Sequence, residues 1–183
     1  VSFYDKINLV PFGEFVPFKK FIPIKKLTDG KLDFSRGEEF KTITFTNNRG
    51  RIINVKPSIC YEGIFPLIHE SNIPLHLIVN ITNDAWFGNT TGPEQHSLAT
   101  RYRAVENSLP LVRVANTGIS GVYDKNGKTL KTLGLDKTGK IDVRLFISKT
   151  NQKELYDKTF ILISIVFFCF LCCYFADFLK KKS

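Results

Sequence analysis

Short apolar runs, separated by polar and turn residues, divide the first 150 residues of the chain. The run Leu75–Ile81 is almost continuously apolar, which is typical of a strand buried on both faces. In Glu94–Asn107, by contrast, Leu98, Tyr102 and Val105 recur at the spacing of a helix. This alternation of strands with short helices predicts an α/β layer fold.

The same patterns place the remaining elements. Residues 1–26 contain Pro11, Pro17 and Pro23, so we expect a loop with extended pieces there. Asn126-Gly127 is a strong hairpin signal. We expect further strands at Thr42–Phe45, Ile52–Ile59, Leu109–Ala115, Gly121–Tyr123, Thr129–Leu133 and Ile141–Ile147.

The C-terminal segment has a different pattern. Phe160–Ala176 is apolar with only Ser164 clearly polar, and its flanks extend it to about 20 residues, the length of a membrane-spanning helix. Lys180, Lys181 and Lys182 follow, and positive charge favours the cytoplasmic side. A single span then places the preceding residues in the periplasm of a Gram-negative bacterium. We therefore expect a first unit at residues 1–150, a linker at 151–158, a transmembrane helix at 159–179 and a cytoplasmic basic tail at 180–183.

Composition narrows the class of protein. The chain is 43% hydrophobic, which excludes a disordered chain, and its lysines are spread out despite a net charge of +9. No nucleic-acid-binding module is recognisable. Neither the cysteines nor His69, His76 and His96 show the spacing of metal ligands. We therefore expect no metal, no cofactor and no disulfide framework.

One cysteine lies outside the apolar tail, in the stretch Ser58–Gly63, SICYEG. Cys60 ends a predicted strand just before a turn, where its sulfur can face a pocket and the next amide can donate to an oxyanion. A free cysteine is also commonly a small buried hydrophobe. The residues around Cys60 leave both interpretations open.

A series of longer motifs resembles one family. They are YDK (4–6), LVPFGEFVPF (9–18), ICYEGIFP (59–66), NITNDAWFG (80–88), GPEQH (92–96) and RYRAVENSLPLVRVANTGISG (101–121). In this order they resemble the apolipoprotein N-acyltransferases, the membrane-bound branch of the nitrilase-like superfamily. The resemblance implies the nitrilase αββα layered fold, here as a partial domain, followed by one C-terminal transmembrane helix.

The resemblance also implies an activity. Family members transfer an acyl chain from a phospholipid, through a cysteine thioester, to the N-terminal amine of a diacylglyceryl-cysteine lipoprotein. The implied partners are a phospholipid, a lipoprotein and the bacterial inner membrane, with the catalytic part in the periplasm.

The resemblance assigns roles to individual residues. Cys60 matches the nucleophile, and Lys6 matches the lysine of a Glu-Lys-Cys triad, where an ammonium would stabilise the thiolate and the developing oxyanion. Glu14 and Glu62 match two further carboxylates, and Tyr61 matches the tyrosine beside the nucleophile. A solvated Lys6 and purely structural glutamates are the alternatives.

Aromatic residues are candidates for the acyl pocket or its lid. We single out Phe15, Phe18 and Trp86, although packing onto the core would equally explain them. The loop Phe12–Lys26 interleaves phenylalanines with lysines, as membrane-interface segments do.

The chain departs from the family pattern at its start. The family's general-base glutamate lies well upstream of the lysine, whereas only five residues precede Lys6 and none is glutamate. We therefore expect this chain to be the C-terminal part of the enzyme. The alternatives are a carbon–nitrogen hydrolase that uses water as the acceptor, and a non-catalytic remnant or subunit that pairs with a separate N-terminal half.

Overall fold

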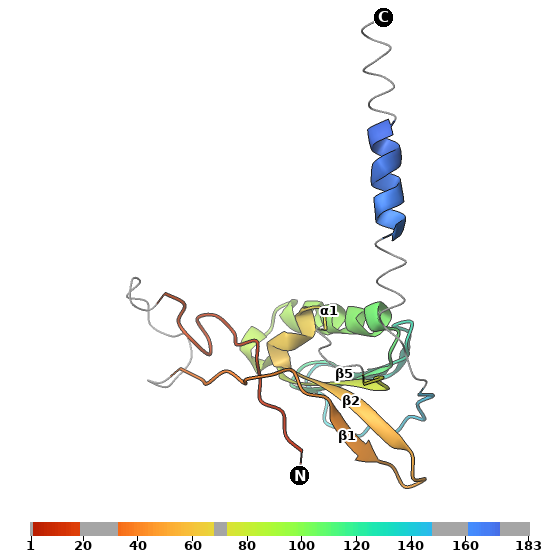
Figure 1. Ribbon diagram of the computed structural model, residues 1–183. Helices are drawn as coiled ribbons and strands as arrows, with labels where there is room; N and C mark the ends of the chain where they lie inside the picture. The colour runs from red at the N-terminus through yellow and green to blue at the C-terminus, as the bar shows by residue number, and fades with distance from the viewer. Residues whose placement is uncertain (1, 19–32, 68–72, 148–160, 173–183) are drawn as a thin grey trace, which may run out of the picture. The chain divides into compact units, whose positions relative to one another are not determined.

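The computed structural model describes residues 2–18, 33–67, 73–147 and 161–172. The chain divides into two units, Val1–Thr150 and Asn151–Ser183. The first unit is built on a six-stranded sheet with strand order β1-β2-β3-β4-β5-β6 (Figure 1).

The sheet is mixed, and the α/β class expected from the sequence is confirmed. Strands β2, β3 and β4 are parallel, whereas β1, β5 and β6 each run antiparallel to their neighbours. The bounds are β1 Ile43–Thr46, β2 Ile52–Ile59, β3 Leu77–Asn83, β4 Leu111–Asn116, β5 Ser120–Tyr123 and β6 Thr129–Leu133.

Glycines close both hairpins of the sheet. Gly50 between β1 and β2 has φ +71°, and Gly127 between β5 and β6 has φ +73°. Residues without a side chain adopt this left-handed conformation at little cost. The predicted Asn126-Gly127 hairpin is therefore confirmed.

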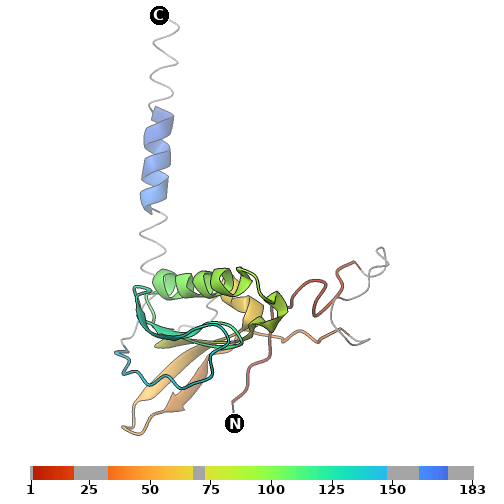
Figure 2. The same cartoon turned by 180° about the vertical axis from the view of Figure 1, so that it is seen from behind.

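Helix α1, Gly92–Asn107, covers one face of the sheet (Figures 1 and 2). Pro93 lies in its first turn, where a missing N–H costs no hydrogen bond. Its Ala104 packs with the buried side chains of the adjoining strands and connections. This core contains Leu75, Ile78, Ala104, Leu109, Leu111 and Tyr123.

The inward face of α1 is not the face that the apolar spacing predicts. Leu98, Tyr102 and Val105 are 49%, 54% and 44% exposed. The buried face instead carries polar side chains, among them Ser97 and Thr100. Polar groups are tolerated beneath a helix only where they find hydrogen-bonding partners, and here the sheet provides them.

The predicted strand at Ile141–Ile147 is wrong. These residues form no helix or strand in the structure, and Phe146 is 96% exposed. A strand needs a neighbour for its N–H and C=O groups, and no described strand pairs with this segment. Apolar–polar alternation alone is therefore not sufficient to form one.

The carboxyl ends of the parallel strands define one edge of the sheet. Strand β2 continues directly into the 3₁₀ helix η1, Cys60–Ile64, and β3 continues into η2, Asp84–Phe87. Because β2 and β3 are parallel neighbours, η1 and η2 leave the sheet at the same edge. This is the edge at which open α/β sheets bind ligands.

In the second unit, residues 161–172 are helical with exposed side chains. Within the described ranges, no helix is both long enough and apolar enough to cross a membrane. Residues 159–160 and 173–179 of the predicted span lie outside those ranges.

Candidate active site at the carboxyl edge of the sheet

Cys60 occupies a strained turn. It is partly buried and has φ +52°, in the left-handed region that side-chain-bearing residues rarely adopt. Such backbone strain persists only where the surroundings enforce it, and it is commonly found at functional sites.

Glu62 connects this turn to the N-terminal segment. Its Oε1 accepts hydrogen bonds from the backbone N–H of Ile7 at 2.7 Å and of Asn8 at 3.1 Å. Its Oε2 accepts from the N–H of Ile59 at 2.7 Å, and the Tyr4 hydroxyl donates to the same carboxylate at 3.0 Å. One buried carboxylate therefore holds together the segment that carries Lys6 and the turn that carries Cys60.

The Tyr4 hydroxyl, which donates to Glu62, has a strongly raised pKa. Burial, together with the negative charge of Glu62 and the hydrogen bond to it, raises the pKa of Tyr4 well above its ordinary value. Tyr4 therefore stays protonated and keeps donating to Glu62 across the physiological pH range.

Lys6 is paired with the second predicted carboxylate. Its Nζ lies 2.7 Å from both carboxylate oxygens of Glu14. Glu14 Oε2 also accepts from the N–H of Val10 at 2.8 Å, within a turn whose N–H groups bond back to the Val10 carbonyl. The N–H of Gly37 donates to the Lys6 carbonyl at 2.8 Å. Side chain and backbone of Lys6 are therefore both fixed.

The predicted aromatic residues are more exposed. Phe15 is partly buried, whereas Phe18 and Trp86 are 73% and 66% exposed. In η2 it is Phe87, not Trp86, that contacts the network described next, with its ring centroid 5.5 Å from that of His96. Tyr61 packs edge-on against Phe65 at 4.9 Å.

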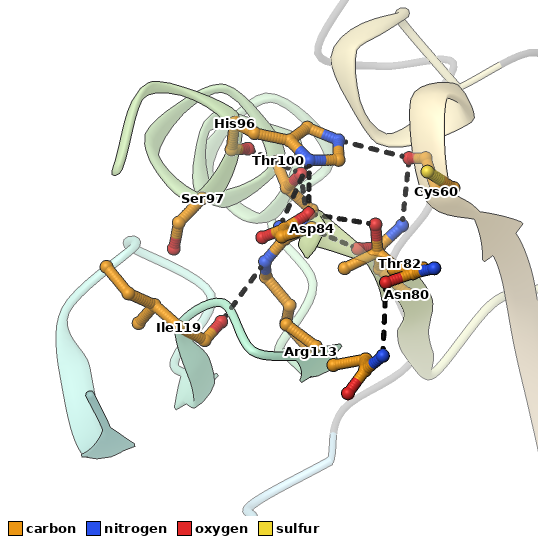
Figure 3. A network of polar contacts seen from close by, with 12 residues as sticks. Cys60, Asn80, Thr82, Asp84, His96, Ser97, Thr100, Arg113 and Ile119 are labelled. Atoms are coloured by element: carbon orange, nitrogen blue, oxygen red, sulfur yellow. Dashed lines mark hydrogen bonds and ion pairs between the residues drawn. The ribbon is translucent and has the colours of Figure 1, made fainter. Parts of the chain in front are cut away.

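Sequence reasoning missed a buried charged network behind Cys60 (Figure 3). Arg113 on β4 donates to Asp84 Oδ2 at 2.7 Å, to Asn80 Oδ1 at 2.5 Å and to Thr100 Oγ1 at 3.1 Å. The side chains of Arg113 and Asp84 are both 0% exposed. This network therefore provides hydrogen-bonding partners for the polar side chains on the buried face of α1.

His96 links the network to the turn that carries Cys60. Its Nδ1 lies 2.8 Å from Asp84 Oδ1, and its Nε2 lies 3.2 Å from the carbonyl oxygen of Cys60. Burial opposes ionisation of Asp84, but the hydrogen bond with His96 and the charge of Arg113 outweigh it and lower the pKa of Asp84.

One signal in the sequence could have indicated the network. Arg113 follows two apolar residues of a predicted buried strand, and a buried charge demands a partner. The structure also shows why two glycines lie beside the network: a Cβ at Gly63 would lie 2.6 Å from Thr100 Oγ1, and a Cβ at Gly118 would collide with Asp84. Both glycines allow main chain to approach the buried polar side chains closely.

The described residues include no group of three or more His, Cys, Asp or Glu side chains that could hold a metal ion. The chemistry available at this edge is that of a thiol, an ammonium, carboxylates and backbone N–H groups.

Comparison with known proteins identifies the family. Residues 1–152 match the carbon–nitrogen hydrolase family, so the chain belongs to it and its fold is nitrilase-like. The apolipoprotein N-acyltransferase of Rickettsia bellii is 45% identical over 177 residues, which cover 95% of this chain and 34% of that protein. That of Bradyrhizobium diazoefficiens is 43% identical over 149 residues, which cover 79% of this chain and 27% of that protein.

The resemblance noted from the motifs is therefore confirmed. The chain spans about a third or less of the length of these relatives. Among solved structures, an amidase from Nesterenkonia sp. AN1 aligns with a TM-score of 0.43 at 20% identity, covering 72% of this chain and 47% of its own.

Proposed function

We propose that this chain is the nucleophile-bearing part of a lipoprotein N-acyltransferase. The observation that carries the proposal is 45% identity, over 95% of the chain, to a protein named apolipoprotein N-acyltransferase. The geometry is consistent with it, because Glu62 joins the backbone at Lys6 to the turn that presents Cys60.

The reaction has two steps. In the first, the Cys60 thiolate attacks the ester carbonyl of a phospholipid, a C–S bond forms, the ester C–O bond breaks, and the lysophospholipid leaves with the proton that the thiol lost. In the second, the N-terminal amine of a diacylglyceryl cysteine attacks the thioester, an amide forms, and the C–S bond breaks. The sulfur ends as a thiol because it regains one proton from the amine, so two moderate barriers replace one high one.

The chain's own groups divide the work in both steps. Lys6 places a positive charge for the thiolate and for the oxyanion of each tetrahedral intermediate, and the Tyr61 N–H donates to the same oxyanion. Glu14 orients Lys6, and Glu62 orients the main chain on both sides of the site. The general-base glutamate comes from an upstream segment of the complete enzyme, which also completes the αββα layers.

The membrane supplies the acyl donor. Residues 159–179 span the inner membrane as a helix after the 151–158 linker, with the first unit in the periplasm and residues 180–183 in the cytoplasm. Phe15, Phe18 and Trp86 line the path of the acyl chain, and the exposure of Phe18 and Trp86 supports this role.

One observation favours a second function. The family that matches residues 1–152 is described by carbon–nitrogen hydrolysis, in which water would take the place of the amine. The two functions share the thioester and differ only in the acceptor.

A chimeric enzyme tests both proposed functions. In it, this chain replaces the matching third of the Rickettsia bellii relative, and the rest of that relative supplies the upstream segment. With labelled phospholipid we expect a hydroxylamine-sensitive acyl adduct on Cys60 and acyl transfer to a diacylglyceryl-cysteine peptide, both lost in Cys60→Ala. Full transfer in Cys60→Ala refutes the proposal, whereas release of free fatty acid with no acylated peptide identifies the hydrolase.

A further inference from the structure

Two side chains contact the carbonyl oxygen of Cys60: His96 on α1 and Asn80 on β3 (Figure 3). His96 Nε2 lies 3.2 Å from it, and Asn80 Nδ2 lies at 3.5 Å, the outer limit of a hydrogen bond. A carbonyl oxygen only accepts, so a hydrogen bond from His96 to Cys60 requires a hydrogen on Nε2. The stronger of the two contacts therefore comes from a histidine that has no place in the Glu-Lys-Cys triad.

The other end of the same peptide unit is the candidate oxyanion donor. A trans peptide is planar, so the carbonyl of Cys60 and the N–H of Tyr61 point in opposite directions. Tyr61 lies in the first turn of η1, where an N–H has no acceptor within its own helix. A side chain that holds the Cys60 carbonyl toward the buried network therefore points the Tyr61 N–H away from the network.

We propose that His96 is the positioning residue of the oxyanion site: by holding the Cys60 carbonyl it orients the Tyr61 N–H toward the acyl oxygen. This inference rests on the proposed thioester chemistry. It assigns His96 no proton transfer and no contact with substrate.

The network makes His96 a rigid support. Asp84 from η2 holds Nδ1 at 2.8 Å, and Arg113 from β4 lies 3.2 Å from the same nitrogen. The Phe87 ring packs against the imidazole, and the Thr100 hydroxyl donates to the His96 carbonyl at 2.8 Å. The ring cannot turn without breaking its buried hydrogen bond with Asp84, so the position of Nε2 is set by the network.

The support is needed because the turn is strained. Cys60 at φ +52° is in the left-handed conformation, which is unfavourable for a side-chain-bearing residue. Without the bond from His96, the peptide unit between Cys60 and Tyr61 is free to rotate toward a relaxed geometry. The thiol would then remain, but the N–H would no longer face the oxyanion.

The test separates thiol reactivity from oxyanion binding in the chimera. Decanal adds reversibly to a thiol to form a thiohemiacetal, whose oxygen needs the oxyanion donors. Iodoacetamide alkylates the same thiol without forming an oxyanion. Mass spectrometry of the Cys60 peptide measures alkylation directly, and protection by decanal gives the aldehyde affinity.

Three substitutions at one position isolate the Nε2 hydrogen bond. His96→Ala removes both ring contacts, His96→Asn keeps a donor only near Asp84, and His96→Gln keeps a donor that reaches the Cys60 carbonyl. His76→Ala is the matched control, because His76 is also buried but accepts a hydrogen bond from the Asn54 N–H at the opposite end of β2.

We expect decanal affinity to fall about tenfold or more in His96→Ala and His96→Asn, a part of the ~10²–10³-fold loss that removal of an oxyanion donor causes. His96→Gln and His76→Ala should retain it, and all four should alkylate at the unsubstituted rate. Equal decanal affinity in all variants overturns the inference, as does a loss in His76→Ala as large as that in His96→Ala. Decanal binding does not require an amine acceptor, so a chimera that fails to transfer acyl groups refutes the proposed function without affecting this result.

Discussion

At the residue scale, the buried charges of Arg113 and Asp84 are matched by each other. Arg113 and Asp84 are both fully buried, yet their mutual contact at 2.7 Å and the surrounding hydrogen bonds satisfy the charged atoms. Removing one partner from such a pair leaves the other charge unpaired in a low-dielectric interior, which costs more than the pair contributes.

Asp84→Asn should lower the free energy of unfolding by about 3–5 kcal/mol near pH 7, because Arg113 stays buried without its counter-charge. The pKa of Asp84 is lowered from 3.8 in the folded state, so its contribution is complete above that value and is lost as pH falls through the lower folded pKa. The difference between the two proteins should therefore shrink below about pH 3.8. Denaturant titrations followed by Trp86 fluorescence measure it.

Asp142→Asn is the matched control for this experiment. Asp142 is 77% exposed and pairs with Lys140 at 3.2 Å, so the change should cost less than about 1 kcal/mol at any pH. Equal effects of the two substitutions near pH 7 would show that the Arg113–Asp84 pair does not stabilise the fold.

Lys6→Ala should reduce acyl transfer in the chimera by roughly 10²–10³-fold, the usual cost of losing one oxyanion donor. The effect on the melting temperature should be small by comparison, because Glu14 keeps its hydrogen bond from Val10. Lys41→Ala, at a lysine paired with Glu39 on the surface, should leave transfer unchanged. A large fall in melting temperature with nearly normal transfer would make Lys6 a structural residue.

At the scale of elements, the sequence predicts where helices and strands begin and end better than it predicts which face of a helix is buried. Strands β2 and β6 have the predicted bounds, and α1 begins two residues before the predicted Glu94. The helical spacing of Leu98, Tyr102 and Val105 nevertheless selects the exposed face. Apolar spacing cannot reveal a helix face that is buried by hydrogen bonds. The partner of this face, Arg113, lies on β4, seventeen residues after His96 in the chain.

The residues of the candidate site fall into two groups, those that belong to recognisable sequence motifs and those that meet only in the folded chain. Cys60, Lys6, Glu14 and Glu62 belong to short motifs that a reader of the sequence can match, and their roles as nucleophile and supports remain predictions. Asp84, His96 and Arg113 come from three separate elements and meet only because β3 and β4 are parallel neighbours. Arg113 within an apolar strand indicates that a buried partner exists, but no local pattern shows which residues meet it.

The loop Phe12–Lys26 is an element whose predicted role can be tested at its aromatic residues. Phe12 and Phe18 have φ +61° and +55°, and Phe18 is 73% exposed, so within the described part of the loop at least one phenyl ring faces outward. Residues 19–26, Phe21 among them, lie outside the described residues.

We predict that changing Phe15, Phe18 and Phe21 together to Ser lowers transfer from bilayer phospholipid and spares transfer from a short-chain soluble thioester. Each phenylalanine buried at an interface contributes about 1.5–3 kcal/mol, so losing three should release the loop from the lipid. The two donors are compared in the chimera, with Phe45→Ser on β1 as an exposed control. Unfolding, or equal loss with both donors, would mean that these rings belong to the core or the active-site wall.

At the scale of the whole molecule, the two units carry different proposals. The proposed function assigns the catalytic chemistry to the unit Val1–Thr150 and membrane attachment to the unit Asn151–Ser183. The exposed apolar side chains of residues 161–172, such as Phe168 and Leu171, support the second of these.

We predict that the 183-residue chain stays with membranes after alkaline carbonate extraction and that a chain ending at Thr150 does not. Phe168→Lys with Leu171→Lys should release the full chain, since each charge near the centre of a spanning helix costs roughly 2.5–3.5 kcal/mol. Phe146→Lys, a similar change at a residue 96% exposed in the first unit, should have no effect. Retention of the shortened chain would place the attachment elsewhere.

The Glu62 carboxylate has a consequence for the order of events during synthesis. It binds the N–H groups of residues 55 and 54 positions earlier in the chain, so the segment around Lys6 leaves the ribosome long before its acceptor exists. That segment waits without its partner until β2 and η1 have formed. A substitution at Glu62 should therefore first expose the segment around Lys6 to proteases, while the sheet made after it still assembles.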